Sequence, residues 1–274
     1  MNTHFSRIKK MLGDGQLPTV VKINLSDPRV IEIVALSGVD AVWLCTEHVP
    51  NDWLSLENQI RAARVHGIDT LVRVGRGSYS DYIRPFEAGA TGIIVPHVAS
   101  EEEARQIVEW VRFHPLGKRA LDGGNIDGDF CFTPVQDYVR NSNEERLLIL
   151  QIESPEALAK VERIAAVPGF DGLLFGPGDF SHRIGKIGQL NDPEVVSARK
   201  KVAAAAAKNG KFAMTAGLIA PLSELVAEGY RLLGIGADVV TISKGLRDRL
   251  RTVKEQIQAL PADSKIPASP SPYA

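Results

Sequence analysis

The chain has 274 residues, with 32 lysines and arginines against 33 aspartates and glutamates, so its formal net charge is −1. This balance argues against a general nucleic-acid-binding protein, because such proteins usually carry a basic surplus. No apolar run is long enough for a transmembrane helix, and none follows the first basic residues as a secretory signal would, so we expect no membrane partner. With 44% hydrophobic residues and only two cysteines, the sequence indicates a soluble, cytoplasmic, single-domain protein, and we expect an enzyme.

A short motif recurs along the chain: a glycine, one further residue, Asp or Thr, and then a short apolar run. The copies begin at Gly38, Gly67, Gly89, Gly169 and Gly236. Each glycine follows a helix-like segment, where it can take the left-handed conformation that ends a helix. The apolar runs show no alternation with polar residues, which is typical of strands buried on both faces of a parallel sheet.

Three further apolar runs bring the predicted strands to eight. The eight predicted strands cover residues 19–24, 41–45, 70–74, 92–96, 147–152, 172–176, 211–216 and 239–243. Helix-start signals follow several of them, since Asp27, Ser154 and Asp192 each place a capping side chain before a proline. Eight strands, each followed by helical sequence, predict an α/β fold of the (β/α)8 TIM-barrel type. A doubly wound open sheet is the alternative, but no G-x-G-x-x-G follows the first strand.

The predicted barrel domain covers residues 1–260 and ends in a helix over 245–259. That helix carries several basic residues, and we interpret it as a solvated or inter-subunit face rather than a nucleic-acid patch. Residues 113–146 are longer than an ordinary loop, and such loops tend to be functional or disordered. The last residues, 261–274, are rich in Pro, Ala and Ser, and we expect them to be a disordered tail.

In a (β/α)8 barrel the active site lies at the C-terminal ends of the strands. The predicted strand ends carry His48, Arg73, Glu153 and Asp179. The two carboxylates follow neighbouring strands, an arrangement that suits a hard divalent cation such as Mg²⁺ or Mn²⁺. In the turn that includes Gly178, glycines allow backbone N–H groups to point into the site and hold a small carboxylate.

Structural roles are open for these residues as well. Glu153 could stabilise a helix dipole, and Asp179 could cap the following helix. Arg73 could pair with a carboxylate at the rim, and His48 could be a hydrogen-bonded loop histidine. We interpret two other histidines, His97 and His182, as structural rather than as metal ligands.

Several segments carry a resemblance to a known family. In chain order they read VDAVWLCTEHVPND, LVRV, FEAGATGIIVPHV, LILQIESPEAL and GFDGLLFGPGDFSHRIG. Over roughly residues 5–255 the chain resembles the HpcH/HpaI aldolases, whose members include 4-hydroxy-2-oxoheptanedioate and 2-dehydro-3-deoxyglucarate aldolases. The resemblance implies a (β/α)8 barrel of the phosphoenolpyruvate/pyruvate-binding type and a class II lyase that depends on Mg²⁺, Mn²⁺ or Co²⁺. The implied reaction is the reversible aldol cleavage of a 4-hydroxy-2-oxo acid to pyruvate, or hydroxypyruvate, and an aldehyde.

The resemblance also implies roles for individual residues. The matching family positions assign the metal to Glu153 and Asp179, the pyruvate keto oxygen to Arg73, and the catalytic base to His48. Backbone groups at Gly178 and Asp179 would hold the pyruvate carboxylate. Family members are commonly homohexamers that exchange C-terminal helices between subunits.

The chain departs from the family pattern at three positions. Cys45 replaces an Asp that orients the catalytic histidine, and we expect its thiol to be a packing group rather than a nucleophile. Glu87 stands where Asp is frequent, and Lys22 stands where an aromatic residue is common. Lys22 could meet an anionic substrate or form a Schiff base.

Two other functions stay open. One is a lyase of the citrate-lyase β-subunit type that acts on CoA thioesters. The other is a non-catalytic barrel that binds a 2-oxo acid without turnover.

Overall fold

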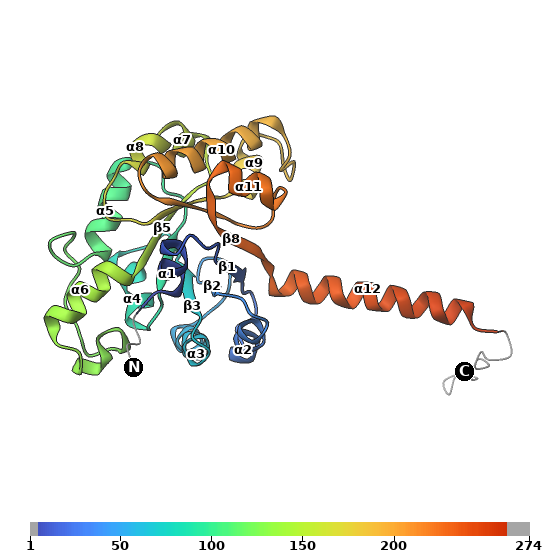
Figure 1. Ribbon diagram of the computed structural model, residues 1–274, viewed down its shortest axis with the longest axis horizontal. Coiled ribbons are helices and arrows are strands. Elements are labelled where there is room, and N and C mark those ends of the chain that lie inside the picture. The colour runs from blue at the N-terminus through green and yellow to red at the C-terminus, as the bar shows by residue number, and fades with distance from the viewer. Residues whose placement is uncertain (1–4, 262–274) are drawn as a thin grey trace. The chain divides into compact units, whose positions relative to one another are not determined.

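The computed structural model of the chain describes residues 5–261, and this part divides after Asp238 into two compact units. Eight parallel strands of the first unit close into a barrel, in which each strand pairs with the next along the chain and β8 pairs with β1 (Figure 1). The strands are β1 (Thr19–Lys22), β2 (Ala41–Cys45), β3 (Asp69–Arg73), β4 (Gly92–Val95), β5 (Leu147–Ile152), β6 (Gly172–Phe175), β7 (Phe212–Thr215) and β8 (Tyr230–Ala237). The predicted (β/α)8 TIM barrel is confirmed.

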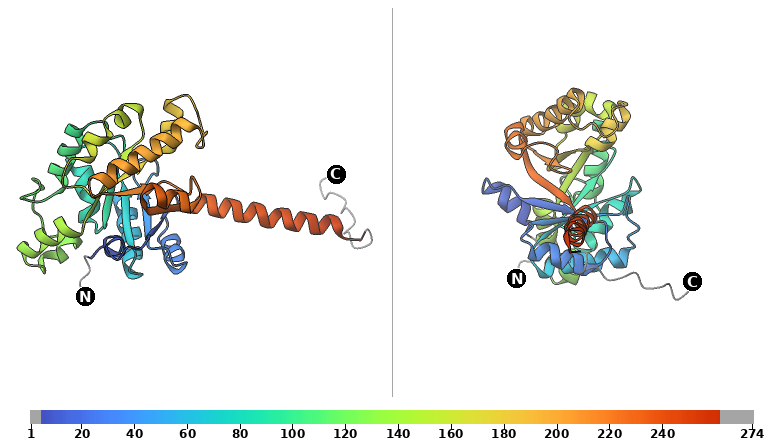
Figure 2. Two further views of the ribbon diagram at one scale, coloured as in Figure 1. Left: turned by 45° about the horizontal axis from the view of Figure 1, so that its top comes forward. Right: turned by 90° about the vertical axis from the view of Figure 1, so that its right-hand side faces the viewer.

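Helices surround the strands of this unit (Figure 2). They are α1 (Arg7–Gly13), α2 (Pro28–Leu36), α3 (Trp53–Val65), α4 (Tyr79–Glu87), α5 (Glu101–Val111), α6 (Val135–Glu145), α7 (Pro155–Ala159), α8 (Val161–Ala165), α9 (Pro177–Arg183), α10 (Pro193–Lys208) and α11 (Leu222–Glu228). The predicted caps are confirmed, because the side chains of Asp27, Ser154 and Asp192 each accept a hydrogen bond from a backbone N–H of the following helix. The long segment 113–146 contains a 3₁₀ helix, η1 (Ile126–Cys131), and then α6.

One predicted strand was wrong. Residues 239–243 lie in a helix, α12 (Asp238–Ala259), and the eighth strand is Tyr230–Ala237. The run Val239-Val240-Thr241-Ile242-Ser243 is β-branched and apolar, which favours a strand when it is taken alone. In the structure its apolar residues continue into a helical pattern at i, i+3 and i+4, and pairing with β1 and β7 selects the preceding segment as the strand.

Side chains alternate between two environments along each strand. Those facing into the barrel form one buried cluster, which includes Val20, Trp43, Leu71, Ile149 and Leu174. The alternate residues pack against the surrounding helices in a second, larger cluster. The alternation determines which residues reach the interior at the C-terminal end of the barrel. These residues stand two places after an interior residue of the same strand.

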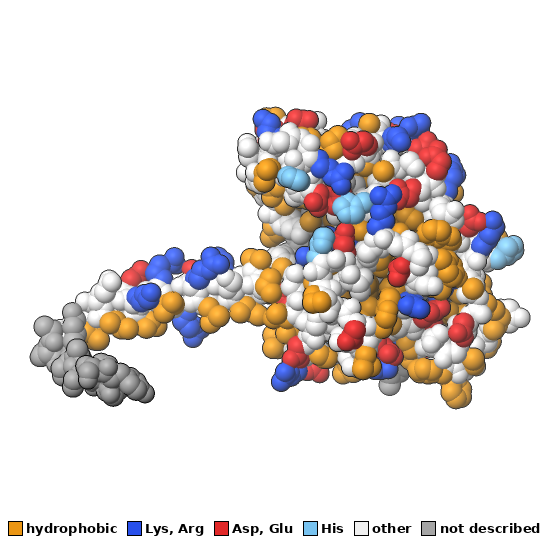
Figure 3. Space-filling view, turned by 180° about the vertical axis from the view of Figure 1, so that it is seen from behind, with side chains coloured by type: hydrophobic (Ala, Val, Ile, Leu, Met, Phe, Trp, Pro, Cys, Tyr) orange, Lys and Arg blue, Asp and Glu red, His pale blue; other side chains and the backbone are white. Residues whose placement is uncertain are grey.

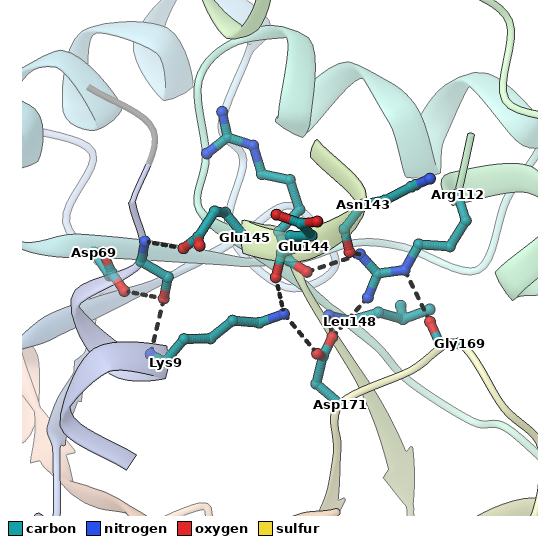
Figure 4. Close-up of polar contacts among 11 residues, drawn as sticks. Lys9, Asp69, Arg112, Asn143, Glu144, Glu145, Leu148, Gly169 and Asp171 are labelled. Carbon is teal, nitrogen blue, oxygen red and sulfur yellow. Dashed lines mark hydrogen bonds and ion pairs between the residues drawn. The ribbon is translucent and has the colours of Figure 1, made fainter. Parts of the chain in front are cut away.

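The N-terminal end of the barrel is closed by α1, whose Ile8 is fully buried in the interior cluster. Asp69, at the start of β3, holds α1 there by accepting hydrogen bonds from the Ile8 N–H at 2.8 Å and the Ser6 hydroxyl at 2.8 Å. Nearby, Asp171 lies between Lys9 and Arg112, at 2.9 and 2.7 Å (Figure 4). These contacts join segments that are far apart in the sequence.

The second unit contains α12. Its apolar side chains recur every three or four residues and so share one face of the helix, which is visible as a stripe in Figure 3. They are Val239, Ile242, Leu246, Leu250, Val253 and Ile257. The predicted helix 245–259 lies within α12, which begins seven residues earlier, at Asp238. The predicted disordered tail, 261–274, falls almost wholly outside the described residues.

Candidate active site

Polar side chains from β2, β3, β4 and β5 meet at the C-terminal end of the barrel. Histidine, acidic and basic side chains gather on one face of this unit in Figure 3. Arg73 is the last residue of β3 and stands two places after the interior Leu71, so its side chain reaches the interior at this end. Its guanidinium lies 5.1 Å from the centroid of the Trp43 ring, and its Nη2 donates to Cys45 Sγ at 3.5 Å.

Glu47 contacts the side chains of both Arg73 and His97 at this end of the barrel. Its carboxylate lies 2.9 Å from Arg73 Nε and 3.1 Å from His97 Nε2, and its side chain is 12% exposed. The contact with Arg73 Nε is an ion pair without hydrogen-bond alignment. Arg73 Nε and Glu47 Oε2 are therefore both buried without a hydrogen-bond partner. Buried polar atoms in this state carry a free-energy cost that a bound polar ligand can offset.

Glu153 follows β5 and is 2% exposed. Its Oε1 accepts a hydrogen bond from the His97 backbone N–H at 2.7 Å and lies 2.8 Å from His97 Nδ1, while Gln151 Nε2 donates to its Oε2. Burial raises the pKa of Glu153, and the negative charge of Asp179 raises it further, although the contacts with His97 and Gln151 act in the opposite direction.

His97 adopts a left-handed backbone conformation, with φ of 57°. This conformation is unfavourable for a residue with a side chain and costs about 1 kcal/mol or more. It presents both the backbone N–H and the ring Nδ1 of His97 to the same oxygen of Glu153. The sequence predicts a structural role for His97, and the structure instead brings its ring to Glu47 and Glu153 of the candidate site.

Asp179 and Gly178 lie in the first turn of α9, and both are exposed. Backbone N–H groups in a first helical turn have no partner within the helix. Gly176, just before α9, has no room for a side chain, because a Cβ there would lie 2.7 Å from Glu153 Cβ and 2.9 Å from its Oε2. The glycine therefore lets the β6 end pass directly beside Glu153.

His48 lies at the edge of this group, with its side chain 57% exposed and its Nε2 3.6 Å from Glu47. Its backbone N–H donates to Cys45 Sγ at 3.4 Å, so the thiol contacts the backbone of His48 and the side chain of Arg73. Glu87 stands at the end of α4 with its carboxylate 3.9 Å from Arg119. Because α4 runs antiparallel to the strands, Glu87 lies toward the N-terminal end of the barrel, away from the candidate site.

Sequence reasoning missed Glu47 and His97. Each is the second residue after a strand, in the Thr-Glu-His segment after β2 and the Pro-His pair after β4. Their position in a βα loop was the available signal, because the loops after barrel strands form the active site. The sequence did not show that Glu47 joins Arg73 to His97, since these contacts span three strands.

A closed (β/α)8 barrel with an arginine and buried carboxylates at its C-terminal rim defines an enzyme of the TIM-barrel class. The chain belongs to the HpcH/HpaI aldolase/citrate lyase family, whose model matches residues 19–244. It is an aldolase-type carbon–carbon lyase.

Relatives agree with this assignment. The chain is 30% identical to a hydroxypyruvate/pyruvate aldolase of Pseudomonas aeruginosa over 97% of its own length and 99% of the relative's. It is 33% identical to a 5-keto-4-deoxy-D-glucarate aldolase of Klebsiella pneumoniae, with 88% and 91% covered. The crystal structure of the citrate synthase SbnG is similar, with a TM-score of 0.84 and 30% identity over 91% of this chain and 98% of that one.

Proposed function

We propose that the chain catalyses the reversible cleavage of a 4-hydroxy-2-oxo acid to pyruvate, or hydroxypyruvate, and an aldehyde. The observation that carries the proposal is the convergence of Arg73 with the Glu153 carboxylate at the C-terminal rim, with Asp179 close enough to raise the pKa of Glu153. Aldolase names among relatives of about 30% identity support the same reaction class.

The carboxylate pair fits a divalent cation such as Mg²⁺, Mn²⁺ or Co²⁺. Burial and the charge of Asp179 raise the pKa of Glu153, and a bound cation would stabilise its charged form, since hard cations prefer such oxygen ligands. No group of three or more potential ligands surrounds one point among residues 5–261, so Glu153 and Asp179 would leave positions for substrate oxygens and water. When bound, the cation would supply a Lewis acid at the oxygens of the 2-oxo acid.

The protein's own side chains would carry the remaining steps. The Arg73 guanidinium, held by Glu47 and stacked on Trp43, would place a fixed positive charge beside the keto oxygen as negative charge develops there. The His48 imidazole would accept the proton of the C4 hydroxyl as the C3–C4 bond breaks, and would return it in the synthetic direction. Backbone N–H groups of Gly178 and Asp179 would hold the substrate carboxylate.

We further propose a homo-oligomer, a hexamer by family resemblance, that acts in the cytoplasm. The apolar stripe of α12 supports association, because Ile242, Leu246, Leu250 and Ile257 are exposed in it, and contiguous exposed apolar surface commonly marks an interaction site. None of the described helices is long and apolar enough to cross a membrane.

Two measurements on the Glu153→Gln variant test the proposal. Glu156→Gln is the matched control, because Glu156 is exposed in α7. The first is calorimetric titration with Mn²⁺, and the second is metal-dependent exchange of the pyruvate methyl protons with deuterium. We expect Glu153→Gln to lose both while Glu156→Gln keeps both. Full exchange by Glu153→Gln after chelation and metal add-back would show that the metal assignment is wrong. Pyruvate binding by the wild type without exchange would indicate the non-catalytic alternative.

A further inference from the structure

Lys22 is a cation inside the C-terminal mouth of the barrel that the mechanism above does not use. It ends β1 and stands two places after Val20, which is fully buried in the interior cluster, so its side chain rises from the interior face of the strand. Its Nζ lies 6.0 Å from the centroid of the Trp43 ring. The Arg73 guanidinium lies 5.1 Å from the same centroid. Two positive charges therefore flank one indole.

Lys22 has no counter-ion among the described residues. The carboxylates whose charges reach it are Glu47 and Asp238, and neither forms an ion pair with its Nζ. Glu47 is engaged by Arg73 and His97, and Asp238 accepts hydrogen bonds from the backbone N–H groups of Asn24 and Leu25, at 2.9 Å each. Burial lowers the pKa of Lys22, and the charge of Arg73 lowers it further.

The contact with the Trp43 ring does not compensate the positive charge of the Lys22 ammonium group. A distance of 6.0 Å stands at the outer limit of about 6 Å for a cation–π contact, so the ring compensates the charge only weakly. A half-buried ammonium group without an anion is unfavourable, and a ligand that supplies an anion there would be bound with a gain in free energy.

The position of β1 indicates which part of a substrate Lys22 would meet. In the closed order of eight strands, β1 lies four strands from β5, so the two are opposite one another across the barrel. Glu153 follows β5 and Asp179 follows β6, which places the proposed metal ligands across the barrel from Lys22, while Arg73 at the end of β3 stands two strands from either side. A substrate held by its 2-oxo acid end would extend its aldehyde-derived end toward Lys22.

We propose that Lys22 is a specificity-determining residue, which binds a second anionic group, a carboxylate or a phosphate, on the aldehyde portion of the substrate. The proposal rests on the aldolase function proposed above. It adds a recognition element that selects anionic over neutral aldehydes.

The test compares the wild type with Lys22→Met, which removes the charge at similar length, and Lys22→Arg, which keeps it. Lys211→Met is the matched control, because Lys211 is also a part-buried lysine on an aromatic ring, 4.4 Å from the centroid of Phe170, but precedes β7 at the N-terminal end of the barrel. With pyruvate as donor, kcat/KM is measured for two aldehyde pairs: succinic semialdehyde against butanal, and glyceraldehyde 3-phosphate against glyceraldehyde. The pair that responds identifies the anion as carboxylate or phosphate.

We expect Lys22→Met to lower kcat/KM for at least one anionic aldehyde by about tenfold to a hundredfold, the range of a charge-assisted hydrogen bond. The neutral aldehydes and the deuterium exchange of pyruvate should be unaffected. Lys22→Arg should retain most of the preference, and Lys211→Met all of it. An equal loss for anionic and neutral aldehydes, or a wild type without preference, overturns the proposal. Inactivation by borohydride in the presence of pyruvate, absent in Lys22→Met, would show a Schiff-base lysine instead.

A binding measurement separates failure of this proposal from failure of the aldolase function. If the wild type neither exchanges pyruvate protons nor forms aldol products, the aldolase proposal fails. Calorimetric titration with glutarate against butyrate still decides the role of Lys22, since tighter binding of the dicarboxylate that Lys22→Met removes supports an anion site. Equal affinities of the wild type and Lys22→Met for glutarate overturn it.

Discussion

Arg73 is held on three sides by side chains that come from β2 and the loop after it. Glu47 pairs with its Nε, Cys45 accepts a hydrogen bond from its Nη2, and the centroid of the Trp43 ring lies 5.1 Å from its guanidinium carbon. A lysine has the same charge but neither the planar fork nor the stacking face. These contacts preorganise the arginine for the oxyanion role proposed for it.

We therefore expect Arg73→Lys to lower kcat by about tenfold or more, because preorganised donors to a developing oxyanion contribute about 3 kcal/mol each. Steady-state kinetics of pyruvate aldol addition measure this effect. A variant that keeps the kcat of the wild type and only raises KM would assign Arg73 to ground-state binding of the substrate.

Cys45 is fully buried, and its sulfur accepts two weak hydrogen bonds, from the Arg73 side chain and the His48 backbone. The resemblance suggested that this position orients the His48 imidazole. In the structure the neighbour of that imidazole is Glu47, at 3.6 Å. We therefore interpret the thiol as a packing group beside Arg73, and we expect a serine of similar size to replace its weak acceptor function.

Two substitutions test this interpretation of Cys45. Cys45→Ser should retain aldol turnover, whereas Cys45→Asp should raise it, because a carboxylate there would hold Arg73 and the adjacent His48 segment more firmly. Turnover with pyruvate and one aldehyde is measured for both variants, before and after treatment with a small alkylating reagent. Loss of activity in Cys45→Ser would show that the thiol takes part in the reaction.

At the scale of elements, the N-terminal end of the barrel depends on Arg112, which follows α5 and is 3% exposed. It donates to the backbone carbonyls of Gly169 at 2.8 Å and Arg146 at 2.8 Å, and to the carboxylate of Asp171 at 2.7 Å (Figure 4). One guanidinium thereby joins the segments that lead into β5 and β6. The register of the two strands that position Glu153 and Asp179 depends on this end of the barrel.

Replacing Arg112 by Met should lower the free energy of unfolding by about 3 kcal/mol, because several buried acceptors lose their donor at once. Urea unfolding followed by circular dichroism measures the difference. Arg105→Met serves as the control, since Arg105 is exposed on α5, the helix that Arg112 follows. Equal stabilities of the two variants would contradict a structural role for the buried arginine.

At the scale of the whole molecule, the apolar stripe of α12 predicts association between copies of the chain. A lysine at position 250 would place a charge in the centre of the stripe, whereas a lysine at 252 would stand beside it. We expect the wild type and Thr252→Lys to form the same homo-oligomer and Leu250→Lys to form smaller species. Sedimentation velocity measures the mass of each. A monomeric wild type would contradict the proposal.

The sequence alone determined most of the fold. Seven of the eight strands fall where buried apolar runs follow a glycine or a polar boundary, and the caps at Asp27, Ser154 and Asp192 place helix starts correctly. These signals are local, because a strand buried on both faces must be apolar and a helix start needs a capping side chain. The eighth strand was missed because β-branched residues 239–243 satisfy a strand pattern and a helical stripe equally well.

The sequence also predicted Arg73, Glu153 and Asp179 at strand ends, and they lie at the end of β3, after β5 and in the first turn of α9 after β6. Only the tertiary structure decided how the rim is connected: Glu47 joins Arg73 to His97, and His97 turns into a left-handed conformation to meet Glu153. It also decided that Lys22 has no counter-ion among the residues that the structure describes. These facts depend on distances between residues of different strands, and a linear pattern carries no information on them until the barrel closes.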